Sequence, residues 1–222
     1  VNIPTFYDGV PRIEGEAKLN LQKVADGFDL ERYKRDLRAG ACYRQSTLDA
    51  LRRNWFEPTF EIHNYKGGLE GTKIPPMASA QVTMRLVGQQ DPDAVFAYFE
   101  RHLHHYLAQL DLLNVKLDVK KVKGSRAVSV AIDNPYVLAA ADACEVGFGR
   151  KPVYDGCGGT IGALPVFQER FPQAPIVLLA ISRVDDGYHA PNEEFKFSQA
   201  EKGVKVISDY LQRIATLPKL QP

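Results

Sequence analysis

Alternation of apolar and polar residues predicts two strands in the first half of the chain. In residues 78–87, three apolar side chains share one face and three polar side chains share the other: Val82, Met84 and Leu86 against Gln81, Thr83 and Arg85. Residues 59–63 alternate in the same way. A period of two residues is typical of a strand with one buried face.

A period near 3.6 residues predicts a helix between these strands and the middle of the chain. Asp91 is a typical capping residue, and Pro92 suits the first helical position of a segment that runs to about Leu110. Shorter helices are expected over 29–37 and 46–55, and strands over 114–122 and 127–132. The pattern favours a small α+β sandwich, in which an antiparallel sheet carries helices on one face.

From Asp133 the pattern changes to alternating helix and strand. Asn134 and Pro135 open a helix that Gly147 and Gly149 end, and a second helix is expected over 161–171. Short strands are expected over 151–154 and 175–181. A capping box at Ser198–Glu201 begins a long helix whose expected core face holds Val204, Ile207, Leu211 and Ile214. So few strands make a poor sheet, so this unit is expected to be the C-terminal part of a larger α/β domain.

The pattern therefore predicts two domains, at 1–132 and 133–222. With 45% hydrophobic and 25% charged residues, the chain has the composition of an ordinary globular protein. A formal net charge of +1 gives no support for nucleic-acid binding, since proteins of that class usually carry a strong basic excess.

Cysteine usage and apolar run lengths bear on location. Cys42, Cys144 and Cys157 are widely spaced and odd in number, which favours a reducing, cytoplasmic compartment over a disulfide framework. No apolar run approaches the roughly 20 residues that a membrane helix needs. Because the chain begins at Val1 without an initiator methionine, we expect a fragment of a longer protein.

His189 is the main candidate for metal chemistry. It lies in the polar turn 185–193, between an apolar strand and a helix, and ligands of open α/β sheets bind at the carboxyl ends of strands. Neutral imidazole is a common metal ligand, and Asp185, Asp186 and Glu193 could orient it or be ordinary solvated carboxylates. A catalytic zinc site needs about three protein ligands, so the sequence predicts part of a metalloenzyme with an incomplete site.

Two further candidates suit anion binding. The segment Gly158–Gly159–Thr160 precedes a helix, where free N–H groups and the Thr160 hydroxyl suit a carboxylate or oxyanion; a plain tight turn is the alternative. Arg85 ends the polar face of its strand, where its guanidinium suits a carboxylate, although a solvated surface arginine has the same pattern.

Six motifs together resemble the C-terminal half of carnosinase-like dipeptidases. These belong to the metallopeptidase family of acetylornithine deacetylase, succinyl-diaminopimelate desuccinylase, aminoacylase and glutamate carboxypeptidase. The motifs are residues 3–10 (IPTFYDGV), 55–59 (WFEPT), 71–75 (GTKIP), 85–92 (RLVGQQDP), 158–161 (GGTI) and 189–193 (HAPNE).

The resemblance implies a dinuclear metal-dependent hydrolase that cleaves an amide bond next to a free carboxylate. Such enzymes bind two divalent ions, zinc or manganese, and activate a water molecule. His189 would be a terminal metal ligand, while Arg85, Gly159, Thr160 and Thr72 would bind a peptide or N-acyl amino acid. Residues 1–132 would be a lid that also mediates homodimerisation, and 133–222 would close the catalytic domain.

The chain departs from the family in lacking the upstream motifs. The other metal ligands, the glutamate base and the oxyanion histidine have no counterpart, so no catalytic residue is expected here and the chain alone should be inactive. Thr160–Ile161–Gly162 also replaces the usual Ser-Ile-Pro. The rival interpretations are a non-enzymatic dimerisation module with a vestigial catalytic remnant, and an unrelated small-ligand binder.

Overall fold

The chain forms two compact units, each built from several stretches of sequence. The computed structural model describes residues 3–36, 39–40, 46–69, 71–112, 114–156 and 161–218. The first unit, here called the hairpin unit, comprises residues 1–13, 52–128 and 156–165. The second, the helical unit, comprises residues 14–51, 129–155 and 166–222.

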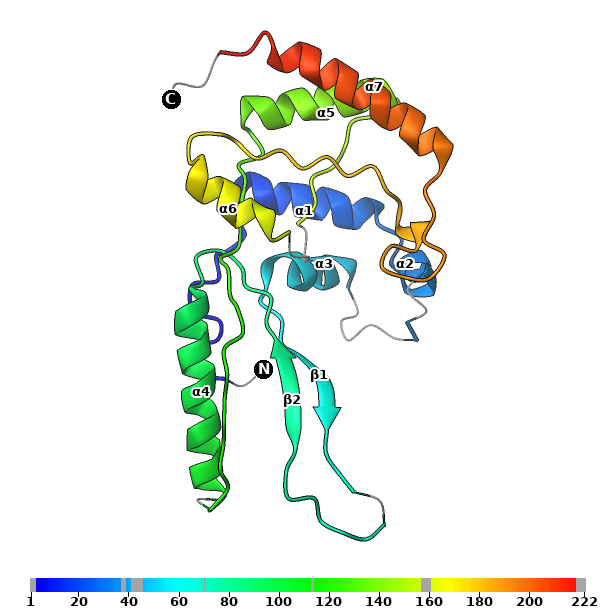
Figure 1. Cartoon of the computed structure of the whole chain (residues 1–222). Helices are drawn as coiled ribbons and strands as arrows, with labels where there is room; N and C mark the ends of the chain where they lie inside the picture. The colour runs from blue at the N-terminus through cyan, green and yellow to red at the C-terminus, as the bar shows by residue number, and fades with distance from the viewer. Residues whose placement is uncertain are drawn as a thin grey trace. The chain divides into compact units, whose positions relative to one another are not determined.

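Helices predominate along the described residues, with one small sheet (Figure 1). In chain order the elements are α1 (Gly15–Gly27), α2 (Leu30–Asp36), α3 (Thr47–Phe56), β1 (Glu61–Lys66), β2 (Ser79–Thr83), α4 (Pro92–Gln109), α5 (Pro135–Phe148), α6 (Ala163–Arg170), the 3₁₀ turn η1 (Val184–Asp186) and α7 (Phe197–Ile214). Of the described helices, none has the length and apolar character to span a membrane.

The sheet of the hairpin unit is a long antiparallel hairpin. Ile62 pairs with Val82 and His63 with Gln81, with an irregularity between His63 and Lys66. Because successive residues of a strand point to opposite faces, this register places the polar residues of both strands together. The two strands predicted from the alternation are thus confirmed, although β2 is shorter than the expected strand 78–87.

The core of the hairpin unit lies where the chain start, the hairpin and α4 meet. Ile3, Phe6 and Val95 are buried there, and partly buried hydrophobic residues pack around them: Phe60, Met84, Leu86 and Phe99. Buried Gln90 joins two of these segments, since its Nε2 donates to the carbonyl of Phe6 at 2.7 Å. The start of the chain is therefore an integral part of this unit.

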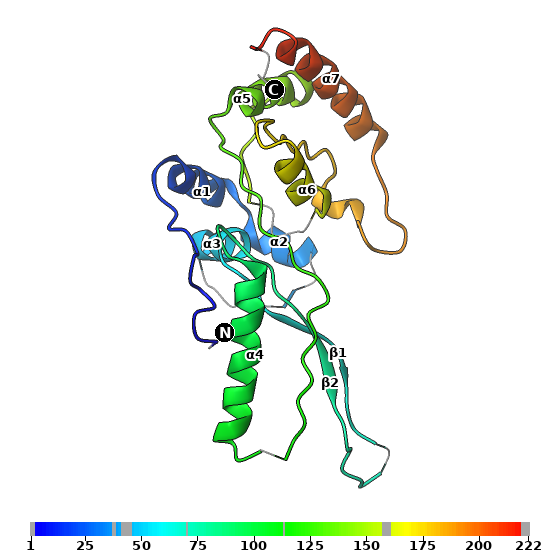
Figure 2. The ribbon, with the colours of Figure 1, turned by 60° about the vertical axis from the view of Figure 1, so that its left-hand side comes forward.

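Helix α4 begins where the sequence predicts. The Asp91 side chain accepts from the N–H groups of Asp93 and Ala94, and Pro92 occupies the first turn. After α4 the chain turns back toward this end of the helix, where Lys121 pairs with Asp93 and Arg126 with Asp91 (Figure 2).

The strands expected over 114–122 and 127–132 are not found. These residues are described, but they carry no strand pairing. Alternation predicts which side chains share an apolar face. A strand also needs a neighbouring strand to which its backbone N–H and C=O groups can hydrogen-bond. The described part of the hairpin unit offers only β1 and β2.

Helices α5 and α7 pack against each other in the helical unit, as Figures 1 and 2 both show. Val206 of α7 is fully buried, and α5 buries the small residues Ala139, Ala140 and Ala143. The cap at Asn134 is confirmed, with its Oδ1 accepting from the N–H of Tyr136 at 2.9 Å. Gly149 ends α5 in the left-handed conformation, with φ +75°.

Three expectations for the helical unit are wrong. The segments 151–154 and 175–181 are extended but unpaired among the described residues, for the reason given above. Helix α7 begins at Phe197 after Lys196, without a side-chain cap, so Ser198 is inside the helix. The expected core face is largely solvent-accessible, since Val204 is 69% and Leu211 56% exposed.

Candidate functional site

The loop that carries His189 has an unusual backbone. It follows η1 and precedes α7, and its residues Gly187, His189 and Asn192 all have positive φ angles of 64–65°. Left-handed backbone is uncommon for residues other than glycine, and is found disproportionately at functional sites. Two such non-glycine residues within four positions require a scaffold that holds the loop.

The imidazole of His189 is accessible from solvent. The residue is exposed, and its ring makes an edge contact with the ring of Tyr188, with centroids 6.3 Å apart. An exposed imidazole is available as a ligand.

The described residues do not complete a metal site around this imidazole. Among them, no three His, Cys, Asp or Glu side chains group closely enough to hold a metal ion. Since a zinc site takes about three or four protein ligands, His189 fits as one member of a set and not as a site. The remaining members would have to come from elsewhere.

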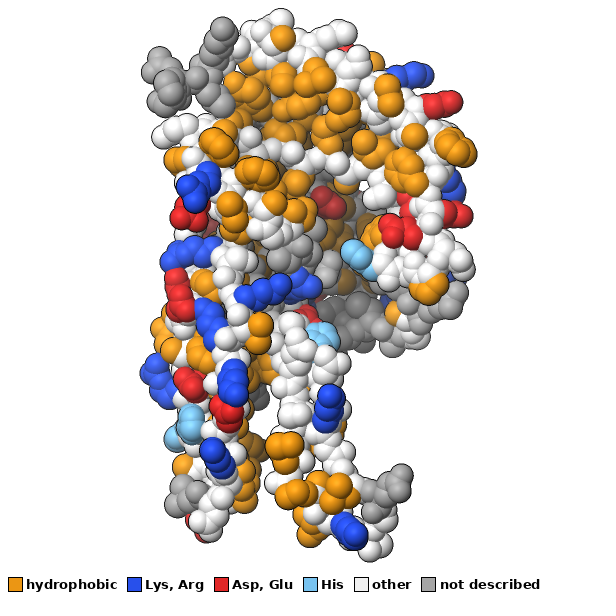
Figure 3. Space-filling model, in the orientation of Figure 1, with side chains coloured by type: hydrophobic (Ala, Val, Ile, Leu, Met, Phe, Trp, Pro, Cys, Tyr) orange, Lys and Arg blue, Asp and Glu red, His pale blue; other side chains and the backbone are white. Residues whose placement is uncertain are grey.

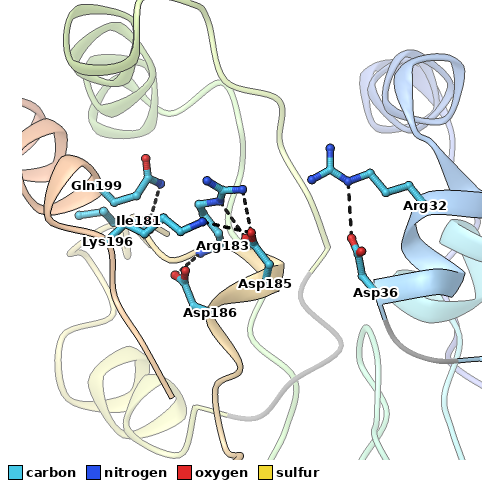
Figure 4. A network of polar contacts seen from close by, with 8 residues as sticks. All are labelled: Arg32, Asp36, Ile181, Arg183, Asp185, Asp186, Lys196 and Gln199. Atoms are coloured by element: carbon cyan, nitrogen blue, oxygen red, sulfur yellow. Dashed lines mark hydrogen bonds and ion pairs between the residues drawn. The ribbon is translucent and has the colours of Figure 1, made fainter. Parts of the chain in front are cut away.

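A network of polar contacts closes the base of this loop (Figure 4). The buried Asp186 accepts from the N–H of Arg183 through Oδ2 at 2.7 Å, and its carbonyl accepts from the N–H of Glu194 at 2.9 Å. On α7, Gln199 Nε2 donates to the carbonyl of Ile181 at 3.0 Å. The chain entering the loop is thereby bonded to the chain leaving it.

An exposed ion-pair group lies beside this network. Asp185 pairs with Arg183 Nε at 2.8 Å and with Lys196 Nζ at 3.3 Å. Partial desolvation raises the pKa of Asp185, but the hydrogen bond from Lys196 and the charges of Lys196 and Arg183 outweigh it, so the pKa lies below its usual value. Asp185 is therefore a carboxylate already engaged with two cations.

Arg85 and Thr72 both belong to the hairpin unit, whereas His189 belongs to the helical unit. The backbone of Arg85 extends the hairpin, since its carbonyl accepts from the N–H of Thr59 at 3.0 Å. Its side chain is exposed just beyond β2. Thr72 is exposed in the connection between β1 and β2, next to Gly71 at φ +81°.

The predicted anion cradle lies outside the described residues. Gly159 and Thr160, with Cys157 and Gly158, are among the positions that the structure does not describe. The helix expected after them is present as α6, which begins at Ala163 instead of Ile161.

One polar cluster escaped the sequence interpretation. On the polar face of the hairpin, His63 Nε2 lies 2.7 Å from Thr83 Oγ1, which also donates to Glu61 Oε2 at 3.3 Å. The alternation of Glu61 and His63 with Ile62 indicates that the two polar side chains share a face. Their partner Thr83 could not be predicted, because it depends on the register between the two strands.

Comparison of the sequence with known protein families identifies a match over most of the chain. The profile of Peptidase family M20/M25/M40 matches residues 22–213, which include the His189 loop and Arg85. The Beta-Ala-His dipeptidase of Homo sapiens is 29% identical over 97% of this chain and 42% of its own length. That of Rattus norvegicus is 27% identical over 97% of this chain and 44% of its own length.

Fungal relatives and solved structures agree. The Cys-Gly metallodipeptidase DUG1 of Saccharomyces cerevisiae is 26% identical over 77% of this chain and 36% of its own length. Human carnosine dipeptidase 1 superposes with a TM-score of 0.83 at 27% identity, covering 98% of this chain and 46% of that one. An M20 family metallo-carboxypeptidase from Sulfolobus solfataricus, at 21% identity, shares the fold with a TM-score of 0.80, over 98% of this chain and 49% of its own.

The chain thus spans less than half the length of the curated relatives it matches. The family match nevertheless covers most of its residues, and the solved relatives share its fold. The described helices with their two-stranded sheet correspond to part of an α/β metallopeptidase. This chain belongs to Peptidase family M20/M25/M40.

Proposed function

We propose that this chain supplies one share of the active site of a metal-dependent dipeptidase or N-acyl-amino-acid amidohydrolase. The observation that carries the proposal is His189, exposed on an anchored loop within the stretch that matches the family. The relatives extend well beyond the matched stretch, so the other metal ligands would come from polypeptide equivalent to that remainder.

In this proposal each unit has its own task. The helical unit, largely from 133–222, supplies His189 as a terminal ligand of one of two zinc or manganese ions. The hairpin unit, largely from 1–132, acts as a lid that presents Arg85 and Thr72. Arg85 suits the free carboxylate of a substrate, because a guanidinium binds a carboxylate through two parallel hydrogen bonds. Gly159 and Thr160 complete the carboxylate contacts.

The relatives suggest the substrates to assay. Their names specify Beta-Ala-His and Cys-Gly dipeptides, which share a short amino side and a free carboxylate. We propose the same substrate class here, and a cytoplasmic location. Binding the carboxylate would fix the amide bond by positioning, which is a large part of what such residues contribute to catalysis.

A chimera tests the role of His189. This chain would replace the matching segment of human carnosine dipeptidase 1, so that the host supplies the remaining ligands. We expect the chimera to bind zinc or manganese and to hydrolyse β-Ala-His, and His189→Ala to lower metal affinity and kcat together, by about 100-fold or more in rate. The measurements are metal titration against a competing chelator and steady-state kinetics.

His104→Ala is the matched control, since His104 is an exposed histidine on α4. It should leave both quantities unchanged. A folded chimera whose metal affinity survives His189→Ala would exclude His189 as a ligand.

A second measurement in the chimera addresses Arg85. Arg85→Gln should raise KM for a dipeptide with a free carboxylate by about 10-fold or more, because a charge-assisted contact is lost. It should have little effect on the same dipeptide amidated at its C-terminus. An equal effect on both substrates would show that Arg85 does not read the carboxylate.

We also propose that the 222-residue chain alone is inactive, because its described residues do not assemble a metal site. The purified chain, supplied with zinc or manganese, should hydrolyse neither dipeptide and should hold no metal stoichiometrically after gel filtration. Turnover by this chain would overturn the proposed division of ligands.

The second candidate function is a dimerisation module. The hairpin exposes large apolar side chains along and beyond its strands, among them Tyr65 at 72%, Ile74 at 92% and Met77 at 77%. Exposed apolar patches commonly mark protein interfaces. If association is the function, Ile74→Lys with Met77→Lys should convert a homodimer into a monomer in light scattering, while the His189→Ala variant of the chain should remain dimeric.

A further inference from the structure

Asp186 makes hydrogen bonds to the chain on both sides of the loop Gly187–Glu193. Asp186 bonds to the chain before the loop through its carboxylate, at 2.7 Å from the N–H of Arg183, and to the chain after it through its carbonyl, at 2.9 Å from the N–H of Glu194. Figure 4 shows the carboxylate directed at the Arg183 backbone, away from the ion pairs of Asp185.

The burial of Asp186 is unusual for a loop carboxylate. The residue is only 1% exposed, and its Oδ1 has no hydrogen-bond partner within the part of the chain that the structure describes. Burying a carboxylate is costly, and an unsatisfied oxygen adds to that cost. The hydrogen bond that its other oxygen accepts from the Arg183 N–H is therefore the contact to explain.

The geometry of the loop shows what those contacts provide. His189 and Asn192 hold positive φ angles that residues with side chains seldom adopt, so an untethered loop would relax to other conformations. The main-chain bond from the Glu194 N–H to the Asp186 carbonyl joins the two loop ends. The carboxylate supports that bond by holding the same residue against the Arg183 N–H. It thereby restricts the positions that the imidazole can reach.

We infer that Asp186 is a positioning residue that presets the backbone carrying His189 for metal binding. The inference rests on the proposed role of His189 as a ligand. Asp186 acts through the main chain and not through the imidazole, since its carboxylate contacts the Arg183 N–H. What the site requires at position 186 is therefore a buried hydrogen-bond acceptor, whether or not it is charged.

Asn and Leu variants separate an acceptor from a charge. Asp186→Asn keeps the shape and an acceptor oxygen for the Arg183 N–H, whereas Asp186→Leu keeps the branching at Cγ and removes the acceptor. In the chimera we expect Asp186→Leu to lower zinc affinity by about 10–100-fold, the range for residues that orient a ligand, and Asp186→Asn to stay within about threefold.

Asp133→Asn is the matched control, because Asp133 is an exposed aspartate of the same unit that lies outside the loop. It should leave zinc affinity unchanged. In the 222-residue chain, amide exchange at Glu194 should accelerate roughly 10-fold or more in Asp186→Leu, with Val206 in α7 unaffected.

The outcomes separate this inference from the proposed function. If His189→Ala leaves zinc affinity intact, the ligand assignment fails. If His189→Ala abolishes binding but Asp186→Leu does not weaken it, only the positioning role fails. Should Asp186→Leu not fold, Asp186→Ala replaces it as the variant without an acceptor: weaker zinc binding with faster Glu194 exchange supports the inference, and normal values of both overturn it.

Discussion

Single residues were predicted well where proline fixes a helix start. Asp91 and Asn134 each precede a proline, and both cap their helices as expected. Ser198 has the signature of a capping box but no proline after it, and α7 begins one residue earlier, at Phe197. A capping-box sequence is compatible with several starting positions of a helix, whereas a proline is tolerated only in the first turn. Proline therefore locates the start of a helix more closely than a capping box does.

The Asp91 cap makes a prediction about acid. The N–H of Ala94 above all, with that of Asp93 and the charge of Arg126, lowers the pKa of Asp91 below its usual value. The pKa of Asp91 is lower in the folded chain than in the unfolded chain. The resulting stabilisation of the fold is therefore complete at pH values above the pKa of the unfolded chain, and it is lost as the pH falls through the pKa of the folded chain. Asp91→Asn keeps the cap without the charge. The difference in Tm between wild type and this variant should therefore shrink between pH 6 and pH 3.

Asn134→Ala provides the uncharged comparison, because its cap does not titrate. It should cost about 1 kcal/mol of unfolding free energy at both pH values. A gap between wild type and Asp91→Asn that stays constant with pH would contradict the assigned contacts. Thermal unfolding followed by circular dichroism gives all three curves.

At the level of elements, the helices were largely predicted and the strands largely were not. A helix satisfies its own backbone, so its signals lie within one segment, as in 92–109 and 135–148. The unpaired segments 151–154 and 175–181 have strand composition, but pairing depends on residues far away in the sequence.

The contact between α5 and α7 gives a prediction at this scale. A Cβ on Gly147 would meet Val206 Cγ2 at 2.4 Å and the Lys202 carbonyl oxygen at 2.9 Å. Gly147→Ala should destabilise the chain by about 1–3 kcal/mol in urea unfolding, because a backbone oxygen in this contact has little room to move. Gly147 thus serves close packing, whereas Gly149 performs the helix-ending role expected of both.

Gly27→Ala is the matched substitution, since nothing lies within 4 Å of its would-be Cβ. It should be neutral or slightly stabilising. Equal stability of Gly147→Ala and Gly27→Ala would show that α5 and α7 do not pack as closely as described.

At the scale of the molecule, hydrophobic periodicity identified the apolar face of α7 but could not predict whether other residues cover that face. Beside α7 lies an open groove with an accessible volume of about 540 Å³, lined by Ile181, Phe195, Val204, Ile207 and Leu211 among others. Figure 3 shows hydrophobic side chains gathered on the surface over α5 and α7. The sequence predicted this face as core, which is the expected error for a chain matching less than half of its relatives' length.

The exposed face predicts how the chain alone behaves in solution. Val204→Lys with Leu211→Lys should reduce binding of the dye ANS and self-association in light scattering, while helix content stays constant, because both side chains are more than half exposed. Val206→Lys places a charge at a fully buried position and should unfold the helical unit. If the double variant binds ANS as strongly as wild type does, the dye binds elsewhere and the prediction for this face of α7 is wrong.

The segment 175–181 carries a consequence for storage and expression. Its run Ile176–Val177–Leu178–Leu179–Ala180–Ile181 is aliphatic, uncharged and without a strand partner among the described residues. Copies of such a hexapeptide can stack in register into cross-β fibrils, in which every peptide group finds a partner and the aliphatic side chains interdigitate. Concentrated preparations of this polypeptide should accordingly form thioflavin-positive filaments over time, and a proline at position 178 should suppress them.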